Sequence, residues 1–277
     1  MSNRISASRA SHHTAAVFDR SAATYDRVGV EFFGPMGREL VRRAGLRPGQ
    51  QVLDVGCGRG AVLLPAAQAV GPTGGVVGID LAPTMVDLTR ADTAHLPHVR
   101  VEVGDAEDPA LPEATFDAVL AGLVVFLLPA PLPALRAYRR LLRPGGRLGV
   151  TTFAAYDPRF TAALGTLARH VPPERRQPPA TGREDDFATR ESTGDLLRRA
   201  GYHQVTVHDV PFESRFRDSD HFVAWVWSHG ARTILESIPP ERLPAALADV
   251  ADVLSPDGGS LRLTTTIRFA LGTREDS

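Results

Sequence analysis

The sequence contains no lysine, so all 31 of its basic residues are arginine. It therefore cannot form a lysine Schiff base, and it lacks the lysine of a phosphate-binding P-loop. Its single cysteine, Cys57, excludes an internal disulfide and a metal site built from clustered cysteines.

An excess of charge of one sign is also missing. The formal net charge of −1 gives no electrostatic reason to expect nucleic acid or a membrane as a partner. The first ten residues have no apolar stretch behind their arginines, so they do not resemble a secretory signal. Residues 118–135 are uncharged and long enough to cross a bilayer, but Pro129, Pro131 and Pro133 argue against one helix. We expect a buried strand and then a helix there, in a cytoplasmic protein.

Apolar runs alternate with helical patterns from residue 46 onward. Strands are predicted at 51–55, 75–79, 99–103, 116–121 and 146–153, with helices between them at about 60–70, 83–94 and 133–142. This alternation indicates an α/β fold with a doubly wound parallel sheet, covered by helices on both faces. Residues 11–44 are typical of two or three short helices. We therefore expect 1–45 to form an N-terminal helical cap and 46–277 to form the α/β domain.

The pattern changes after Phe153. Residues 171–190 are rich in proline and charge, which predicts a loop, and a short helix then leads into a strand at 202–210. A helical stretch at about 218–253 precedes a final strand at 260–271. The two late strands would add a hairpin with one antiparallel member, giving a seven-stranded, mostly parallel sheet. The inserts at about 155–190 and 212–258 would form a helical lid.

The first strand runs into a glycine turn at residues 56–61, which has the form G-x-G-x-x-A. Glycine removes the Cβ atom where backbone must come close to a ligand. The turn alone also fits a dinucleotide site, with Asp80 at the end of the second strand as the ribose-binding acid. A nicotinamide-dependent dehydrogenase is thus an alternative, although no acid pair suited to hydride transfer accompanies the turn.

Further features set the turn in context. Asp54 lies at the end of the first strand, Asp105 follows the third strand, and a hairpin closes the chain. The motifs are "LDVGCGRG", "VVGIDLAPTMV", "VGDAEDPALPEATFDAVLAGLVVFLL" and "LLRPGGRLGVTTF". In this order they resemble the class I S-adenosylmethionine-dependent methyltransferases, most closely the small-molecule branch with the ubiquinone/menaquinone-type enzymes. The resemblance covers roughly 45–153 tightly and the last strands loosely. It implies a Rossmann-like methyltransferase fold and S-adenosyl-L-methionine as cofactor.

The resemblance also implies a set of cofactor-binding residues. Asp80 would accept the ribose hydroxyls, Asp105 the adenine amino group, and Asp54 would order the turn and anchor the amino end. Hydrogen bonds to a charged group contribute roughly 1.5–3 kcal/mol each. The three acids would also suit helix N-termini, and an aromatic from the N-terminal helices would also suit core packing. The implied set is Tyr25, Asp54, Gly56, Gly58, Asp80, Leu81, Met85, Asp105, Ala106 and Gly122.

Methyl transfer from a sulfonium needs alignment of donor and acceptor, and a general base only where the acceptor holds a proton. The fourth strand and the segment after it are apolar, which predicts an apolar acceptor pocket. No Asn-Pro-Pro-Tyr motif is present, which argues against a nucleobase or amide nitrogen as acceptor. No acid follows the fourth strand to hold magnesium, and the run "REDD" at 183–186 is better interpreted as a solvated loop than as a metal cluster. We therefore predict no metal.

The acceptor pocket would take its polar groups from the cap and the lid. We predict His229 as the base because it shares a helical face with Phe222 and Trp225, although a helix C-terminus alone also favours a histidine. Phe126, Phe222 and Trp225 are predicted to bind the acceptor. The aromatic stripe would equally suit core packing or a subunit interface, so the N-terminal or lid helices also offer surfaces for a homo-oligomer.

These observations predict a methyltransferase that acts on a small, largely apolar secondary metabolite, aromatic or terpenoid, by O- or C-methylation. The alternative is a methyltransferase-like cyclase or binding protein that retains S-adenosylmethionine without methyl transfer.

Overall fold

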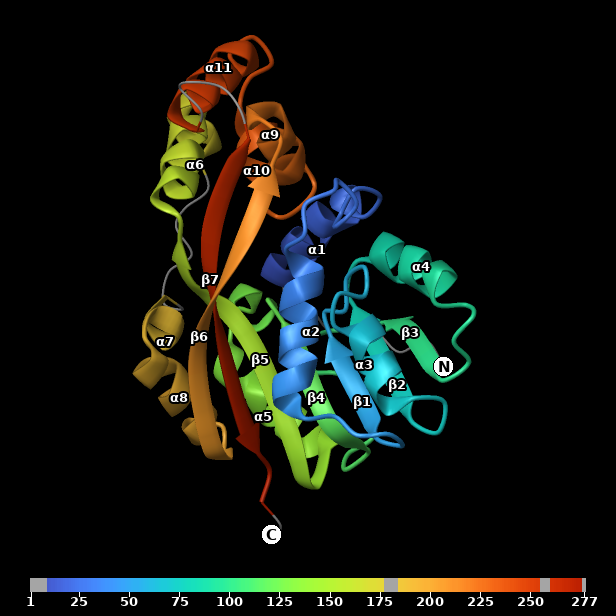
Figure 1. Cartoon of the computed structure of the whole chain (residues 1–277). Helices are drawn as coiled ribbons and strands as arrows, with labels where there is room; N and C mark the ends of the chain where they lie inside the picture. The colour runs from blue at the N-terminus through green and yellow to red at the C-terminus, as the bar shows by residue number, and fades with distance from the viewer. Residues whose placement is uncertain (1–8, 177–183, 255–259, 276–277) are drawn as a thin grey trace.

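A seven-stranded sheet forms the centre of the computed structural model, which describes residues 9–176, 184–254 and 260–275 (Figure 1). The strand order is β3-β2-β1-β4-β5-β7-β6. Strands β1 to β5 are parallel, and β7 runs antiparallel to both β5 and β6. The strands are β1 (Gln51–Val55), β2 (Gly75–Asp80), β3 (Val99–Val103), β4 (Phe116–Gly122), β5 (Leu142–Tyr156), β6 (His203–Phe216) and β7 (Leu261–Thr273). The predicted doubly wound, mostly parallel sheet is confirmed.

Helices cover both faces of the sheet and bury two separate apolar clusters. One cluster contains side chains of α2 (Phe33–Ala44), α3 (Leu63–Val70) and α4 (Pro83–Asp92). The other contains side chains of α5 (Pro131–Leu141) and α8 (Arg190–Arg199). Residues 52–55 of β1 are buried, as expected for a central parallel strand that is covered on both faces.

The uncharged run at 118–135 is divided between several elements. Strand β4 ends at Gly122, a 3-10 turn η1 follows at Val125–Leu127, and α5 begins at Pro131. Proline is tolerated in the first turn of a helix because that position needs no hydrogen-bonded N–H. Within the described ranges, no helix combines the length and the apolar character that a membrane span requires.

Several of the remaining helices gather near one end of the sheet. Figure 1 shows these helices around the C-terminal end of β6 and the N-terminal end of β7. They are α6 (Pro158–His170), α9 (Ser219–Trp227), α10 (Arg232–Ser237) and α11 (Leu243–Leu254). Helix α1 (Arg9–Ser21) packs against α4. Helices α9 to α11 form the connection between β6 and β7, and we call these three helices the lid.

Several predicted boundaries were wrong. Strand β6 continues to Phe216 instead of ending near 210, because Pro211 lies on an edge strand, where a missing N–H is tolerated. Strand β5 is likewise longer than 146–153. The predicted loop at 171–190 contains a 3-10 turn η2 (Pro173–Arg175) and a short helix α7 (Glu184–Ala188). Of the "REDD" run, Arg183 lies outside the described residues, while Asp186 pairs with Arg199 at 3.3 Å.

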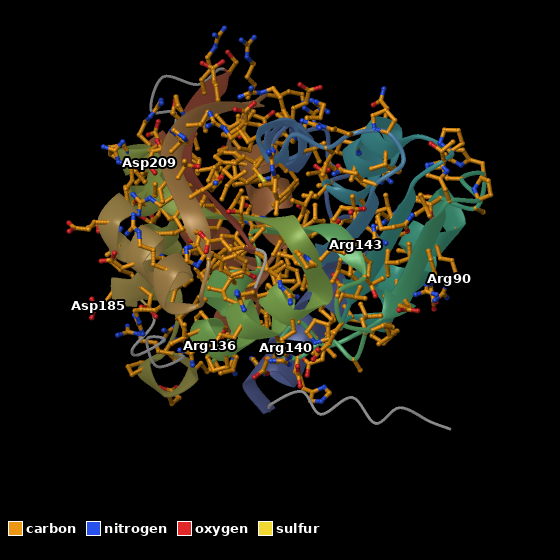
Figure 2. All side chains as sticks on the ribbon, turned by 90° about the horizontal axis from the view of Figure 1, so that it is seen from below. Arg90, Arg136, Arg140, Arg143, Asp185 and Asp209 are labelled. Carbon is orange, nitrogen blue, oxygen red and sulfur yellow. The ribbon has the colours of Figure 1, made fainter. Side chains whose placement is uncertain are left out.

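Arg136 and Arg140 of α5 and Arg143 at the start of β5 are exposed. Figure 2 shows Arg136 and Arg140 toward the lower side of the view and Arg143 nearer its middle. Arg140 pairs with Asp108 at 3.1 Å, and Arg143 pairs with Asp117 at 2.8 Å. These arginines therefore face solvent and pair with acids at the surface.

Candidate functional site

The glycine turn after β1 adopts a conformation that only glycine tolerates well. Gly56, Gly58 and Gly60 have φ values of +66°, +47° and +86°. A Cβ atom on Gly56 would lie 2.4 Å from a methyl group of Val124, and one on Gly58 would lie 3.8 Å from the Tyr25 ring. The turn therefore brings bare backbone close to two other parts of the chain.

A cavity of about 100 Å³ lies over this turn. Its walls come from α1, the glycine turn, the end of β2, the start of α4 and the segment after β4. Eight of the ten predicted cofactor residues line it: Tyr25, Gly56, Gly58, Asp80, Leu81, Met85, Ala106 and Gly122. Segments far apart in the sequence thus meet at the carboxyl ends of the parallel strands, where α/β sheets bind ligands.

Asp80 is held in place by backbone amides. The Gly58 N–H donates to Oδ2 at 2.8 Å, and the Ala82 N–H donates to Oδ1 at 2.9 Å. Burial raises the pKa of this carboxyl above its usual value. The carboxylate has about four acceptor positions in all, so it retains capacity for a ligand hydroxyl.

Asp54 is a buried carboxyl without a hydrogen-bond partner for either oxygen among the described residues. Burial raises its pKa well above the usual value, and the charge of Asp80 raises it further. A buried carboxylate without a partner is costly. A bound ammonium group, such as that at the amino end of the cofactor, would provide the missing partner.

Asp105 has a local role as well as a place near the cavity. Its Oδ1 accepts the Glu107 N–H at 2.8 Å, and burial raises the pKa of its carboxyl. This bond fixes the turn that presents Ala106 to the cavity. The helix-cap alternative fails for all three acids, because Val62 and Ala82 occupy the N-cap positions of α3 and α4 and no described helix directly follows β3.

A second cavity, of about 320 Å³, adjoins the first. Five residues line both cavities: Thr14, Phe18, Tyr25, Leu123 and Leu127. Tyr25 stacks on Phe33 with ring centroids 4.7 Å apart, so it packs in the core and also borders the two spaces. We call the second space the acceptor cavity.

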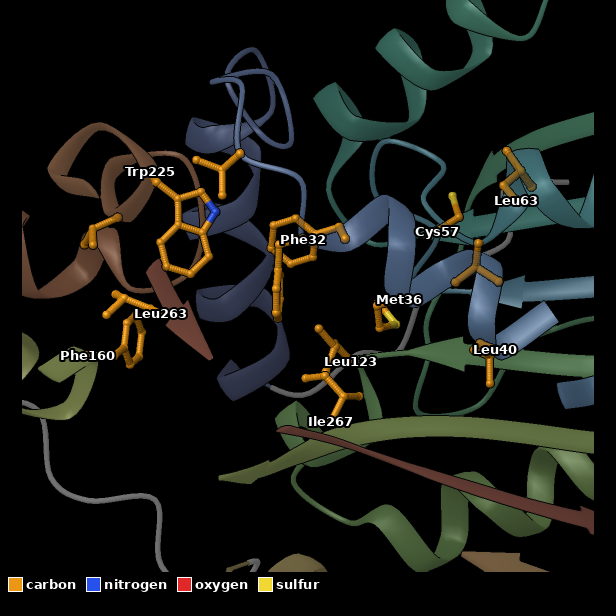
Figure 3. Packing of buried hydrophobic residues seen from close by; sticks show 14 of the residues in the cluster. Phe32, Met36, Leu40, Cys57, Leu63, Leu123, Phe160, Trp225, Leu263 and Ile267 are labelled. Carbon is orange, nitrogen blue, oxygen red and sulfur yellow. The ribbon is translucent and has the colours of Figure 1, made fainter. Parts of the chain in front are cut away.

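Aromatic rings dominate the wall of the acceptor cavity. Figure 3 shows Trp225, Phe160 and Phe32 around one region, with Leu123 nearby. The Trp225 ring centroid lies 5.9 Å from that of Phe32 and 5.8 Å from that of Phe160. The other aromatic lining residues are Phe18, Tyr25, Phe33, Phe126, Phe153 and Tyr156.

The prediction that Phe222 contacts the acceptor is wrong. Phe222 is completely buried, and its ring centroid lies 5.4 Å from that of Phe216. The cavity is lined instead by Trp225 of the same helix. Spacing on a helix groups the two residues correctly. It does not show that β6 covers the earlier turn of α9.

His229 lines the acceptor cavity just beyond α9. Its Nδ1 lies 2.6 Å from the Trp225 carbonyl oxygen, which can only accept, so Nδ1 carries the hydrogen and Nε2 keeps its lone pair. Burial lowers the pKa of His229 to about 4, so its imidazole is neutral at pH 7. A histidine placed only by the helix dipole would instead have a raised pKa.

Sequence reasoning missed part of the site. Leu123 borders both cavities with a φ of +57°, and its N–H donates to the buried Thr151 Oγ1 at 2.9 Å. Such a conformation is strained for a branched side chain and recurs at functional sites. Phe32, Tyr156 and Phe160 also line the acceptor cavity. The close spacing of aromatic residues at 153, 156 and 160 is the feature of the sequence that could have indicated this part of the cavity wall.

Comparison with known proteins agrees with this geometry. Residues 52–146 match the methyltransferase domain family. The chain is 40% identical over 271 residues to nocamycin O-methyltransferase of Saccharothrix syringae, which covers 92% of this chain and 96% of that protein. It is 41% identical over 191 residues to aklanonic acid methyltransferase DauC of a Streptomyces strain, covering 65% of this chain and 86% of that one.

The fold also recurs among solved structures. The structure of the 4+2 cyclase SpnF superposes with a TM-score of 0.55 at 20% identity, over 88% of this chain and 82% of that one. At this identity the likeness concerns the fold alone. The glycine turn, the acids at the strand ends and the relative at 40% identity together show that the chain belongs to the S-adenosylmethionine-dependent methyltransferases and is an enzyme that uses this cofactor.

Proposed function

We propose that the enzyme methylates an oxygen atom of a small, largely apolar natural product in the cytoplasm. The observation that carries this proposal is that the cofactor cavity and the acceptor cavity share five lining residues. A ligand in one cavity would therefore lie next to a ligand in the other. The relatives include a protein named as an O-methyltransferase of the natural product nocamycin. The proposal requires neither nucleic acid nor a membrane as partner.

The residues of the first cavity hold the donor. Within this cavity Asp80 accepts the ribose hydroxyls, and the turn at Asp105 presents Ala106 to the adenine. The buried Asp54 is not a lining residue, but its unpartnered carboxyl two residues before Gly56 supplies the acid for the ammonium group. When bound, S-adenosylmethionine supplies a methyl group on a positively charged sulfur. Tyr25 and Leu123 border both spaces, so they limit the path along which an acceptor atom can approach. Such alignment is the main contribution of a protein to this displacement.

His229 takes the proton of the acceptor hydroxyl at Nε2. A hydroxyl becomes strongly acidic as its oxygen gains a methyl group, so a base of low pKa suffices late in the step. Burial keeps the imidazole neutral, and the Trp225 carbonyl fixes which nitrogen is free. Helix α9 is tied to the N-terminal segment because His221 Nε2 lies 2.7 Å from the Val28 carbonyl oxygen. The base lies just beyond this anchored helix and is held to it through the Trp225 carbonyl.

The shape of the acceptor follows from the rings that surround it. Nine aromatic side chains line the acceptor cavity. Such a wall favours an apolar aromatic or terpenoid skeleton as acceptor over a sugar or a peptide. The electron-rich faces of these rings also stabilise a nearby positive charge. The sulfonium of the bound cofactor would carry such a charge at the border between the two cavities.

The test is product analysis with a base variant and a matched control. The protein is incubated with S-adenosylmethionine and a metabolite extract from a strain that lacks its gene, and products are analysed by mass spectrometry. Wild type and His208→Gln, at an exposed histidine on β6, should add one methyl group to an acceptor oxygen. His229→Gln should be slower by at least about a hundredfold, with unchanged affinity for S-adenosylhomocysteine.

Three results would contradict the proposal. An isomer of unchanged mass would identify a cyclase that retains the cofactor, and a bound but unaltered metabolite would identify a binding protein. Methylation at carbon, unaffected by His229→Gln, would overturn both the O-methylation and the role of the base.

A further inference from the structure

A third hollow, of about 450 Å³, lies beside the acceptor cavity. It is formed by α6, the segment that follows α6, and α10. Three of its lining residues are arginines, and its other polar side chains are hydroxyls. The wall includes Gly165, Arg169, Arg175, Arg176, Thr233 and Ser237.

The three arginines make no ion pair with any carboxylate of the described chain. Arg169 donates to the Thr166 hydroxyl at 3.0 Å, and Arg176 donates to the Val171 carbonyl at 3.1 Å, both neutral acceptors. Most arginines elsewhere are paired, as Arg232 is with Glu236 at 2.9 Å. Three unpaired guanidinium groups around one hollow produce a positive potential that an anion would neutralise.

The acidic side chains near the hollow do not supply that anion. Asp249 of α11, which packs on α6, pairs with His170 at 2.7 Å. Glu174 is exposed beside Arg175 and is not part of the wall of the hollow. The positive charge of the hollow is thus left for a ligand.

The hollow and the acceptor cavity are separated by very little protein. Thr233 lines both of them, and the consecutive residues Leu164 and Gly165 of α6 line one each. A molecule in the acceptor cavity that extends past Thr233 would enter the arginine-lined hollow. We propose that this hollow binds a carboxylate carried by the acceptor at the end away from the methylated oxygen. This rests on the proposed function, because it names the class of acceptor for the same site.

The chemistry of arginine fits this role. The planar guanidinium presents donors in a fork that matches both oxygens of a carboxylate. All three arginines are exposed, so solvent weakens each interaction, and the gain comes from several weak contacts together. We therefore expect an effect of about tenfold on affinity rather than a requirement for binding.

The experiment compares acids with neutral analogues of the same length. Hydroxynaphthyl alkanoic acids of stepwise longer chain and their methylamides are titrated into the protein with S-adenosylhomocysteine present, by isothermal titration calorimetry. At one chain length the acid should bind about tenfold more tightly than the amide. Added salt should reduce this preference, because exposed charges are screened.

Variants assign the preference to the hollow. Arg169→Gln, Arg175→Gln and Arg176→Gln combined should abolish it while the amide affinity stays unchanged. Arg47→Gln, at an exposed arginine between α2 and β1, is the matched control and should retain it. Unchanged affinity for S-adenosylhomocysteine shows that the combined variant is folded, and Arg175→Gln alone provides a milder second variant that should lose part of the preference.

The outcomes separate this inference from the proposed function. Equal binding of acid and amide at every length, or a preference that survives in the combined variant, overturns the carboxylate site, while binding of the amides leaves the acceptor cavity and the proposed function standing. Tighter binding of phosphate monoesters than of acids at every length overturns the choice of carboxylate. If neither acids nor amides bind while S-adenosylhomocysteine does, the acceptor cavity itself has been wrongly assigned.

Discussion

Acidification tests the environment of His229. Its pKa in the folded protein is about 4, against about 6.5 for an unperturbed histidine. Between these two values the unfolded chain binds more protons than the folded one. The free energy of unfolding therefore falls as the pH falls through this range.

The size of the effect follows from the two pKa values. Each tenfold difference in proton affinity is worth about 1.4 kcal/mol, so a pKa lowered to about 4 costs the folded state about 2 kcal/mol between pH 7 and pH 5. Buried carboxyls act in the opposite direction. Burial raises the pKa of Asp26 to about 6, and its folded form takes up a proton more readily than the unfolded one. The comparison must therefore be made against a variant.

The assay is urea unfolding of wild type and His229→Gln at pH 7 and pH 5. From pH 7 to pH 5 the free energy of unfolding should fall by about 2 kcal/mol more in wild type than in His229→Gln. The contributions of the carboxyls are common to both proteins and cancel in this comparison. His208→Gln controls for the loss of an imidazole at an exposed position. Equal losses in wild type and His229→Gln would show that the His229 ring accepts a proton freely in the folded state, and the assignment of a neutral, enclosed base would be refuted.

Other expectations address the cofactor, the packing, the acceptor and metals. Asp80→Ala should weaken S-adenosylhomocysteine binding at least about tenfold by calorimetry, since it removes charged hydrogen bonds and the support of the glycine turn; tight NAD binding would contradict the cofactor assignment. Gly37→Ala should lower the free energy of unfolding by more than about 1 kcal/mol, because its Cβ would meet the Ala61 carbonyl oxygen of the glycine turn; an unchanged melting temperature would argue against this close packing. Trp225→Ala should raise the acceptor KM without changing cofactor affinity, whereas unaltered kinetics with a smaller species on size exclusion would place this face at a subunit interface. Activity should be unchanged after treatment with EDTA. If EDTA inactivates the enzyme and magnesium restores its activity, a group of carboxylates binds a metal, contrary to the prediction.

The cofactor half of the site could be predicted from the sequence because its determinants are local. Glycines with positive φ follow directly after β1, and the acids stand at the ends of consecutive strands. Parallel strands bring their carboxyl ends to one edge of the sheet, so order along the chain translates into proximity in space. Asp80 and the glycine turn are therefore recognisable without long-range information.

The acceptor half depends on contacts that the sequence does not display. Phe32 and Phe160 reach the cavity only because the N-terminal segment, α6 and the lid pack together. Helical spacing placed Trp225 and His229 on one side of α9, but it could not show that Phe216 encloses Phe222. The low pKa of His229 is likewise a property of its enclosure. The hollow lined by Arg169 and its neighbours has no sequence motif at all.

The place where the lid leaves the sheet has a consequence for how such enzymes diversify. Phe216 of β6 stands opposite Leu261 of β7, so the chain departs from and returns to adjacent points of one hairpin. A segment anchored in this way can be lengthened, shortened or exchanged without disturbing the pairing below it. Trp225 and His229 belong to the exchangeable part, whereas Asp80 and the glycine turn belong to the scaffold. Grafting a lid from one relative onto another would then transfer the choice of acceptor while the requirement for the same methyl donor stays unchanged.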